Sequence, residues 1–537
     1  MKKNNIAILL AFTTIFGINA VMASDFDGGR SHLKSFTFRS EVKEHSKKSP
    51  ESVNKEEAGN KENLAAGEVK ENKMPIQAQA TAEAVVKSEN KAEIKELLEK
   101  IKSGNKIDVI TLNNGVKIIY KKNTSADIVT VKMVSKIGSA YETAGNNGIS
   151  TLLFEMLKKG NAKLNAEQIA AGIEKTGAIF DTEVSKLEGT ITLTTTLKTF
   201  EQNFDIFADC VNTSTFPEEE LNKEKQFLTA AIKASNDKMD EVCSKLFYRT
   251  MFENHPYAFH QYGTEESINK LKREDIIKWY KEMLVPANMT FVVVGNIEAD
   301  VIKKAVEKRF GSLPKNDKQP AVIGEVDGKI KAGAKPFTAL KEVKELKDKA
   351  QCFIYMGFLT PGVDSADYGS LKILSTVLGG GMSSRLFSIL RDKESLSYQI
   401  TAYYQTLKGN SALIMLMGTQ PEKYEQAIAS LKREAKRLST ELITEEEYNR
   451  AKNKIVGTYA LSRNTMSQQA QFLGTWDALG LGADFENQFL EKTLAPTRED
   501  IRKAAEKYID IDKAVIAVIY PSGKVEVKTG AKKQEKK

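Results

Sequence analysis

The tetrapeptide Arg-Glu-Asp-Ile occurs twice in this chain, and this repeat is the feature that most constrains its fold. The first copy runs from Arg273 to Ile276 and the second from Arg498 to Ile501. Each copy opens a helical pattern that is followed, 17 or 18 residues later, by a short apolar run typical of a buried strand. A period near 225 residues predicts a duplicated unit made of several helices and strands.

Other segments repeat the same plan. The strand-like run VKMVSKIG precedes a helix that begins at Gly148, and the run CFIYMGF precedes a helix expected over 367–378. Two β-rich runs flank Asn114 and Gly115, which predicts a hairpin. Strands that flank groups of helices indicate an α+β fold. We expect two tandem homologous domains, each with an antiparallel-rich sheet packed against several helices.

Composition divides the chain into segments. An early stretch rich in Lys, Glu, Asn, Ala and Ser has too few apolar residues to fold alone, and a later one rich in Lys, Gly and Pro is typical of a connector. The expected segments are a signal peptide (1–23), a disordered charged spacer (24–105), an N-terminal domain (106–315), a linker (316–343), a C-terminal domain (344–525) and a charged tail (526–537).

The first residues predict export. A short basic start is followed by an apolar run over 6–21 and by small residues before Ser24, as in a secretory signal peptide. A retained anchor helix is the alternative, but the run is shorter than the ~20 residues that span a bilayer. No later stretch is long and apolar enough to cross a membrane. We therefore expect an exported, periplasmic protein with no stable membrane span after signal cleavage.

The charge pattern and the cysteines exclude some functions. Lys and Arg exceed Asp and Glu by only 8, and the two signs are interleaved along the chain, so nucleic acid is not an expected partner. Three cysteines cannot all pair within one chain, and none stands in a metal-binding spacing. Buried thiols are expected, and a bridge between Cys210 and Cys243 stays open.

The segment GISTLLFEMLKKG, residues 148–160, has the pattern of a metal-binding helix without the metal ligands. Its apolar residues recur at helical spacing on one face, and the opposite stripe carries Thr151, Phe154, Glu155 and Lys158. Positions i and i+4 share one face of a helix, which is how an HxxEH motif presents two imidazoles to one zinc ion.

This frame resembles the zinc helix of the insulinase (pitrilysin) family of metallopeptidases. The similarity continues through GSAYE, EKTGA, STFPEEEL and NHPYAFHQYGTEESI and into the second half, to about residue 521. It implies a chain that forms half of a clam-like chamber. In the family's register the two histidines fall on Thr151 and Glu155, the general base on Phe154 and the third ligand on Ala231. An accompanying family glutamate matches Glu224.

These substitutions leave no zinc site. Catalytic zinc needs about three N, O or S donors around an open position, and a hydroxyl, a benzyl ring and one carboxylate do not supply them. His255 and His260, in NHPYAFH, are expected to pack and hydrogen-bond within a loop, with a relocated metal site as the alternative. Nothing near Ser150 or Cys210 resembles an activated nucleophile. No cofactor is therefore expected in this chain.

The segment LGGGMSSRLFSILRDKESLSYQI, residues 378–400, carries Arg391 and Tyr398 seven positions apart. It is similar to the family's second-half signature, in which an arginine and a tyrosine bind the substrate main chain and the developing oxyanion. A fixed cation and a phenol suit that role. A structural role for both residues is the alternative. A phosphate cradle is not favoured, because the GxxxxGK[ST] pattern is absent from the sequence.

The resemblance implies a divided enzyme. The leading hypothesis is a non-catalytic, substrate-clamping subunit of an exported heterodimeric zinc metallopeptidase, with the zinc in a partner subunit of the same family and a peptide as substrate. The alternative is a peptide-binding or scaffold pseudo-peptidase without a protease partner. A self-sufficient hydrolase is the remaining hypothesis.

Overall fold

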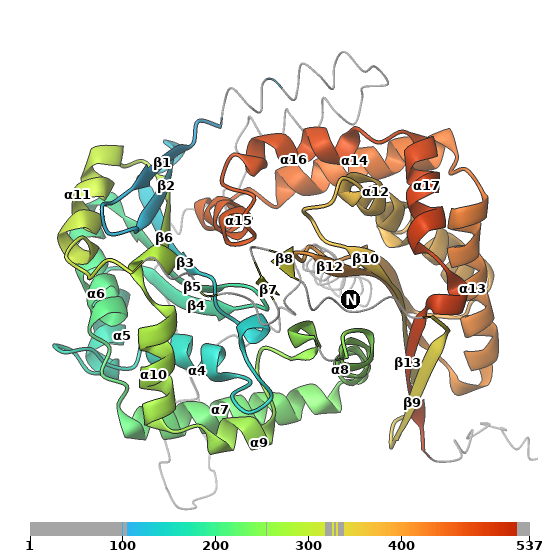
Figure 1. The fold of residues 1–537 in the computed structure, drawn as a ribbon, viewed down its shortest axis with the longest axis horizontal. Coiled ribbons are helices and arrows are strands. Elements are labelled where there is room, and N and C mark those ends of the chain that lie inside the picture. The colour runs from blue at the N-terminus through green and yellow to red at the C-terminus, as the bar shows by residue number, and fades with distance from the viewer. Residues whose placement is uncertain are drawn as a thin grey trace, which may run out of the picture.

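The computed structural model describes residues 99, 105–253, 255–316, 320, 325–326, 329–330 and 338–522. The expected signal peptide, the charged tail and all of the spacer except residues 99 and 105 lie outside this range. Within it, two sheets with their helices stand side by side (Figure 1). None of the helices in these ranges has both the length and the apolar character needed to cross a bilayer.

The first half is built on a six-stranded sheet with the order β1-β2-β6-β3-β5-β4, in which only the β2–β6 pair is parallel. The expected hairpin forms, because β1 and β2 pair across the turn at Asn114 and Gly115. The strands are β1 (Asp108–Thr111), β2 (Lys117–Lys122), β3 (Ile128–Ser135), β4 (Ile179–Val184), β5 (Gly189–Thr196) and β6 (Thr290–Gly295).

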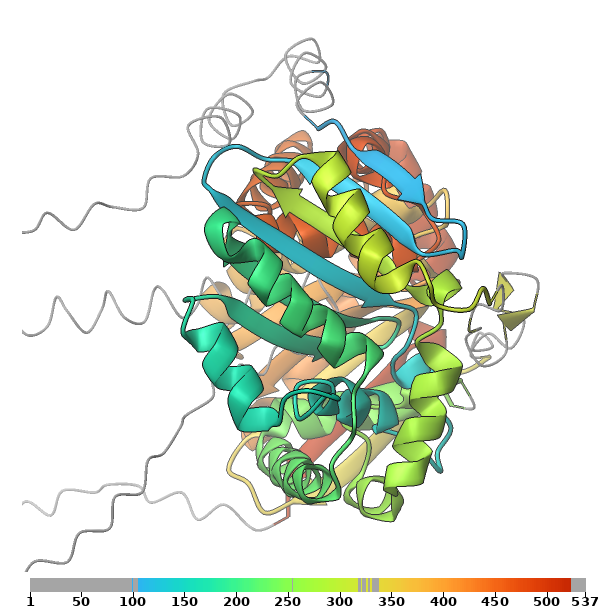
Figure 2. The same ribbon diagram turned by 90° about the vertical axis from the view of Figure 1, so that its left-hand side faces the viewer.

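Helices cover the outer face of this sheet, as Figure 2 shows from the first half's side. A phenylalanine cluster joins α6 and α11 to the sheet, with the ring centroids of Phe291 and Phe310 4.5 Å apart. The helices of this half are α4 (Ile149–Met156), α5 (Ala166–Glu174), α6 (Phe200–Asn212), α7 (Glu218–Asp237), α8 (Met239–Met251), α9 (Glu265–Lys270), α10 (Arg273–Met283) and α11 (Ala299–Phe310).

The second half has a five-stranded sheet with the order β9-β13-β10-β12-β11. Its strands are β9 (Lys341–Lys347), β10 (Cys352–Pro361), β11 (Gln399–Tyr404), β12 (Asn410–Thr419) and β13 (Val515–Pro521). Its helices are α12 (Tyr368–Gly379), the π-helix η5 (Leu386–Lys393), α13 (Tyr424–Thr440), α14 (Glu445–Leu461), α15 (Met466–Ala478), α16 (Phe485–Leu494) and α17 (Arg498–Tyr508). Between the halves, β7 (Glu325–Val326) pairs with β8 (Lys329–Ile330), and β9 begins inside the stretch expected as linker.

The two sheets confirm the duplication. The order β2-β6-β3-β5-β4 corresponds strand for strand to β9-β13-β10-β12-β11, and in both the first two strands of the order are parallel. The helices α10 and α17 both begin at the arginine of the repeated tetrapeptide. The last strand of each half, β6 or β13, is therefore inserted into the middle of its sheet.

One helix of each half packs against the sheet of the other half, as the positions of α8 and α15 in Figure 1 show. Helix α8 packs on β10 and β13, where the Cys243 thiol donates to the carbonyls of Phe353 and Ala517 at 3.4 and 3.3 Å. Helix α15 packs on β3 and β6, and a Cβ at Gly474 would lie 2.5 Å from Val134 Cγ2. The halves are thus joined through two shared cores.

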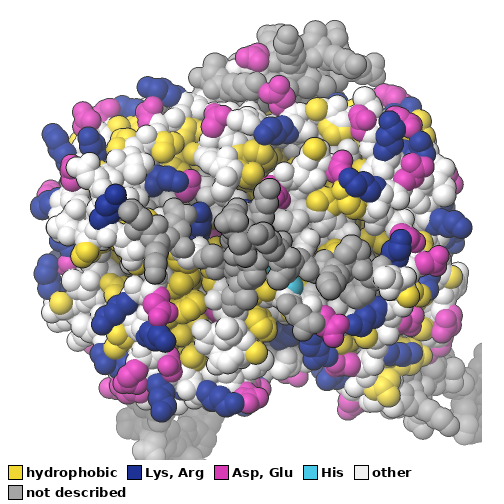
Figure 3. All heavy atoms as spheres, viewed as in Figure 1, with side chains coloured by type: hydrophobic (Ala, Val, Ile, Leu, Met, Phe, Trp, Pro, Cys, Tyr) yellow, Lys and Arg dark blue, Asp and Glu magenta, His cyan; other side chains and the backbone are white. Residues whose placement is uncertain are grey.

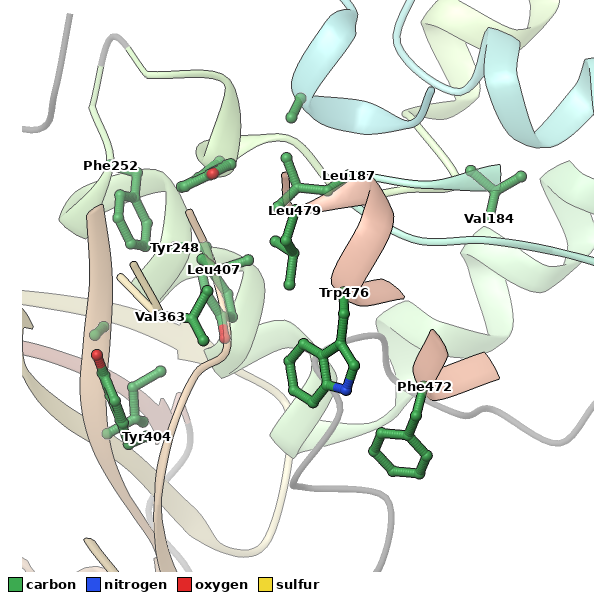
Figure 4. Close-up of a cluster of buried hydrophobic side chains, with 14 of the residues drawn as sticks. Val184, Leu187, Tyr248, Phe252, Val363, Tyr404, Leu407, Phe472, Trp476 and Leu479 are labelled. Atoms are coloured by element: carbon green, nitrogen blue, oxygen red, sulfur yellow. The ribbon is translucent and has the colours of Figure 1, made fainter. Parts of the chain in front are cut away.

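A cluster of buried apolar side chains lies where these elements meet (Figure 4). Leu187 comes from the β4–β5 hairpin of the first half. Trp476 belongs to α15, Leu479 directly follows that helix, and Leu407 lies between β11 and β12 of the second half. A buried polar contact reinforces it, because the hydroxyl of Tyr257 donates to the carbonyl of Lys408 at 2.8 Å. The surface of the protein is charged, unlike this apolar cluster: lysine, arginine, aspartate and glutamate are interspersed over the face in Figure 3.

The close approach of Gly474 to Val134 predicts that the same substitution, glycine to alanine, has opposite effects on stability at Gly474 and at Gly457. Replacing glycine with alanine inside a helix favours the helix by about 1 kcal/mol. A Cβ added at Gly457 of α14 would meet no atom within 4 Å, so Gly457→Ala should stabilise the protein by about 0.5–1 kcal/mol. At Gly474 the added methyl overpacks the contact with Val134, so Gly474→Ala should destabilise it by about 1–2 kcal/mol. Urea unfolding measures both, and equal stabilisation by the two substitutions would contradict the tight packing of α15.

Candidate functional site

The helix that corresponds to the family's zinc helix is α4, and a buried carboxylate holds its N-terminus. Glu142 accepts hydrogen bonds from the backbone N–H of Gly148 at 2.7 Å, from that of Ser150 at 2.9 Å and from the Asn147 side chain at 2.8 Å. These bonds satisfy backbone donors that a helix start leaves unpaired. Burial raises the pKa of Glu142 above its usual value, against the effect of these bonds. The hydrogen bonds to Glu142 fix the position of the start of α4.

Two of the four degenerate positions are occupied by structural side chains. The Thr151 hydroxyl donates to the carbonyl of Gln261 at 2.7 Å, and the residue is only 8% exposed. Phe154 is fully buried against the start of β5, where a Cβ at Gly189 would lie 2.6 Å from its ring. The position that holds the general base in the family is therefore part of the core in this chain.

The other two positions lie on α4 and α7, which pack against each other. Glu155 accepts a hydrogen bond from Thr182 at 2.9 Å and pairs with Lys158 at 3.3 Å. Ala231 of α7 has no side-chain donor atom. Glu224, one of the buried residues of that helix, pairs with Lys159 at 2.6 Å. Glu155 and Glu224 thus each have a lysine as their counter-ion.

This set of side chains does not fit a zinc ion. Zinc prefers three or four imidazole, thiolate or carboxylate donors directed at one point. The positions offer one hydroxyl already donating to a carbonyl, and one carboxylate bonded to Thr182 and Lys158. In the part of the chain that the structure describes, no group of three or more His, Cys, Asp or Glu could hold a metal ion.

The two histidines of the loop NHPYAFH have packing roles, as expected. Nδ1 of His255 accepts from the backbone N–H of Tyr257 at 3.2 Å, and Nδ1 of His260 accepts from that of Tyr262 at 3.3 Å. Burial, with the nearby Lys186, lowers the pKa of His255 to about 4. Burial also lowers the pKa of His260 to about 3. Both rings are neutral at pH 7.

The nucleophile candidates are engaged elsewhere. The Ser150 hydroxyl accepts a hydrogen bond from the Trp279 indole at 3.1 Å. Cys210 and Cys243 are buried free thiols and do not pair with each other, and Cys352 is also free. Burial raises the pKa of Cys210 to about 11, which keeps it in the unreactive thiol form.

Arg391 and Tyr398 present unpaired polar groups at the second half. The Arg391 guanidinium stacks over the Phe387 ring at 4.3 Å, both within η5. Tyr398 is 86% exposed and immediately precedes β11. Over the described ranges, neither the guanidinium nor the phenol hydroxyl makes a hydrogen bond or ion pair. Both groups are therefore available to a molecule outside this chain.

The two parts of the predicted site lie on different elements. Helix α4 packs on α7, α10, β4 and β5, whereas η5 packs on β11, α12 and α13. Thr151, Phe154 and Glu155 thus lie on α4 and Ala231 on the neighbouring α7. Arg391 and Tyr398 lie in the other half.

Sequence reasoning missed a cavity of about 370 Å³ between the halves. It is bounded by the β4–β5 hairpin on one side and by α12, β11, α14 and α15 on the other. Glu188, at the end of that hairpin, is buried in its wall. A single glutamate between Leu187 and Gly189 gives no sequence signal, because the elements that surround it are distant along the chain.

Two sequence profiles of one peptidase family match the chain. The profile described as Insulinase (Peptidase family M16) matches residues 117–265, and the one described as Peptidase M16 inactive domain matches residues 270–455. The chain belongs to the insulinase family, M16. The match to the profile described as an inactive domain, and similarity to a protein named as a non-peptidase homolog, make it a pseudo-peptidase-like member of M16.

Known M16 proteins are similar over most of their length. An "Uncharacterized zinc protease YmxG" of Bacillus subtilis is 28% identical over 77% of this chain and 98% of its own. In Helicobacter pylori, a "Zinc protease PqqE" is 23% identical (78% and 93% covered), and a "Non-peptidase homolog YmxG" is 22% identical (75% and 91% covered). The crystal structure of a peptidase M16 inactive domain from Pseudomonas fluorescens superposes with a TM-score of 0.71 at 19% identity, covering 78% and 98%, which shows the shared M16 fold.

The burial of Phe154 predicts that the family's general base cannot simply be restored. Phe154→Glu would place a carboxylate in a packed core and leave part of the ring's volume empty, so we expect a loss of about 3 kcal/mol or more of unfolding free energy. The control Phe154→Leu keeps the site apolar and should cost about 1 kcal/mol. Chemical denaturation compares the two. A Phe154→Glu protein as stable as wild type would show that this position is not core.

The neutral histidines predict a loss of stability in acid. The unfolded chain takes up protons on these rings below about pH 6.5, whereas the folded protein resists protonation until pH values near 4 and 3. Stability should therefore fall as pH drops below 6.5, by up to about 1.4 kcal/mol per pH unit for each ring. Urea unfolding of wild type and His260→Gln between pH 7 and pH 4.5 measures this. An unchanged slope in the variant would contradict a neutral His260.

Proposed function

We propose that this chain is the non-catalytic, substrate-clamping subunit of an exported, heterodimeric zinc metallopeptidase. The observation that carries the proposal is the unpaired state of Arg391 and Tyr398 in a chain whose own α4 has no metal donor set. Its two halves would form one side of a clam-like chamber in the periplasm. A partner of the same family would supply the zinc helix and close the other side.

The geometry of the pair suits the binding of a peptide in its transition state. Stacking on Phe387 limits the motion of the Arg391 guanidinium, so a cation is held in place before substrate arrives. The exposed Tyr398 hydroxyl can donate to a developing oxyanion. Fixed donors of this kind stabilise charge that appears only as the reaction proceeds. Zinc, when bound by the partner, would supply the activated water.

The comparisons support a division of labour. One organism, Helicobacter pylori, has both a protein named as a zinc protease and a protein named as a non-peptidase homolog, and this chain is similar to both. A pair of that kind is what a two-chain peptidase would require. The alternative, a peptide-binding scaffold without a protease partner, is favoured by the cavity between the halves, which needs no chemistry to hold a ligand.

The clamp is tested in a reconstituted complex. The chain is mixed with an M16 relative from the same genome that carries an intact HxxEH motif, and cleavage of an unfolded peptide is followed. Arg391→Ala and Tyr398→Phe should each lower kcat/KM about 100-fold without changing the amount of complex seen by size-exclusion chromatography. Lys393→Ala, an exposed charge in the same helix, should leave kcat/KM unchanged.

Two results would count against the proposal. Full activity of both variants would remove the clamp role and leave the scaffold alternative. Cleavage by the isolated wild-type chain at the rate of the complex would show that no partner is needed.

A further inference from the structure

The cavity between the halves has two walls of different character. One wall is the end of the β4–β5 hairpin, with Glu183, Lys186, Glu188 and Thr190. The facing wall comes from the second half and is rich in aromatic rings, among them those of Tyr459, Phe472, Trp476 and Phe489. The apolar cluster in Figure 4 shows Trp476 and Leu479 with Leu187 of the hairpin nearby. A ligand here would touch both halves.

The hairpin wall carries two buried polar atoms that are not satisfied. Glu188 is 6% exposed, and its Oε1 accepts from the Thr475 hydroxyl at 2.8 Å and from the Gln471 amide at 2.6 Å. Its Oε2 has no hydrogen-bond partner among the residues the structure describes, and neither has the hydroxyl of Thr190, which is 2% exposed.

Charges of both signs lie around Glu188. Glu183 pairs with Thr190 in the β4–β5 register and also lines the cavity, which brings a second carboxylate close. The nearby ammonium of Lys132 donates to Gln471 at 2.6 Å, and that of Lys186 donates to the carbonyls of Tyr257 and Phe259 at 3.0 and 2.9 Å. Burial, with Glu183, raises the pKa of Glu188 to about 7, although Lys132 opposes the rise.

The facing wall already holds one guanidinium between aromatic rings and a carboxylate. Arg463 lies over the rings of Tyr459 and Phe472 at 3.7 and 3.6 Å, and its guanidinium pairs with the buried carboxylate of Glu486. A carboxylate beside aromatic faces is a general arrangement for a planar cation. Glu188 reaches the helix α15 of this aromatic wall through its bonds to Thr475 and Gln471, and its Oε2 has no hydrogen-bond partner among the described residues.

We propose that this cavity binds the basic side chain of a peptide, an arginine or lysine, with its cationic group on Glu188 Oε2 and the Thr190 hydroxyl. Lys454, from α14, also lines the cavity and suits an acidic or carbonyl group of the same peptide. The site lies within one chain. It therefore requires neither a partner subunit nor Arg391 and Tyr398, and it can be tested apart from the clamp.

Calorimetry on the isolated full chain tests the site with two short peptides, acetylated and amidated at their ends, that differ only in one residue. One carries arginine and the other carries citrulline, which has the same shape without the charge. The arginine peptide should bind at least tenfold more tightly. Because Glu188 must lose its proton to pair with the cation, this preference should be larger at pH 8 than at pH 6. Equal affinity of the two peptides, or no binding of either at millimolar concentration, would overturn the proposal.

Variants assign the effect to this carboxylate. Glu188→Gln should abolish both the preference for arginine and its pH dependence, and a thermal unfolding curve shows whether the protein is folded. The amide resembles the protonated acid in shape, so folding should be retained. Glu155→Gln, on α4 against Thr182, lies outside the cavity lining and should leave the affinity unchanged. A full arginine preference in folded Glu188→Gln, or its loss in Glu155→Gln, would contradict the assignment. Peptide cleavage is not measured here, so this result is separate from that of the clamp.

Discussion

The structure depends on the exchange of two helices between its halves. Each sheet has one face covered by helices of its own half and depends, over part of the other face, on a helix from the opposite half: α15 on β3 and β6, and α8 on β10 and β13. The contact at Gly474 and the thiol of Cys243 against two strand carbonyls show how closely these helices approach. Because dense cores allow little relative motion, the exchange holds the halves at a fixed distance and defines the cavity between them.

The degenerate site is not an exposed remnant. Phe154 has become part of the core, Thr151 ties α4 to the loop at Gln261, and lysines next to α4 neutralise Glu155 and Glu224. In a metallopeptidase the ion would supply positive charge at such a place. In this chain Glu155 and Glu224 have lysine counter-ions, and α4 packs against α7, α10 and the sheet.

Sequence patterns predicted the parts of the fold that are written locally. The repeated tetrapeptide marks α10 and α17, the Asn114-Gly115 turn marks the β1–β2 hairpin, and the apolar spacing after Gly148 marks α4. The same patterns could not show that Phe154, on the stripe opposite the apolar face, is fully buried, because its contact at Gly189 is tertiary. Nor could they show Glu188 beside Thr475, since nearly 300 residues separate the two partners. The spacing of apolar residues shows which face of a helix is apolar, but the tertiary packing determines which residues contact each face.

The central position of the last strand in each half has a consequence for how the chain acquires its structure. Strand β2 cannot complete its pairing until β6 has been synthesised. The inner face of that sheet stays uncovered until α15, which lies in the last part of the described chain, has been added. Contacts so distant in sequence make a high contact order, which slows folding and keeps apolar surface uncovered for longer. Neither half can complete its core while the chain is still emerging. Maturation is therefore expected to be a late, concerted event that needs almost the entire polypeptide.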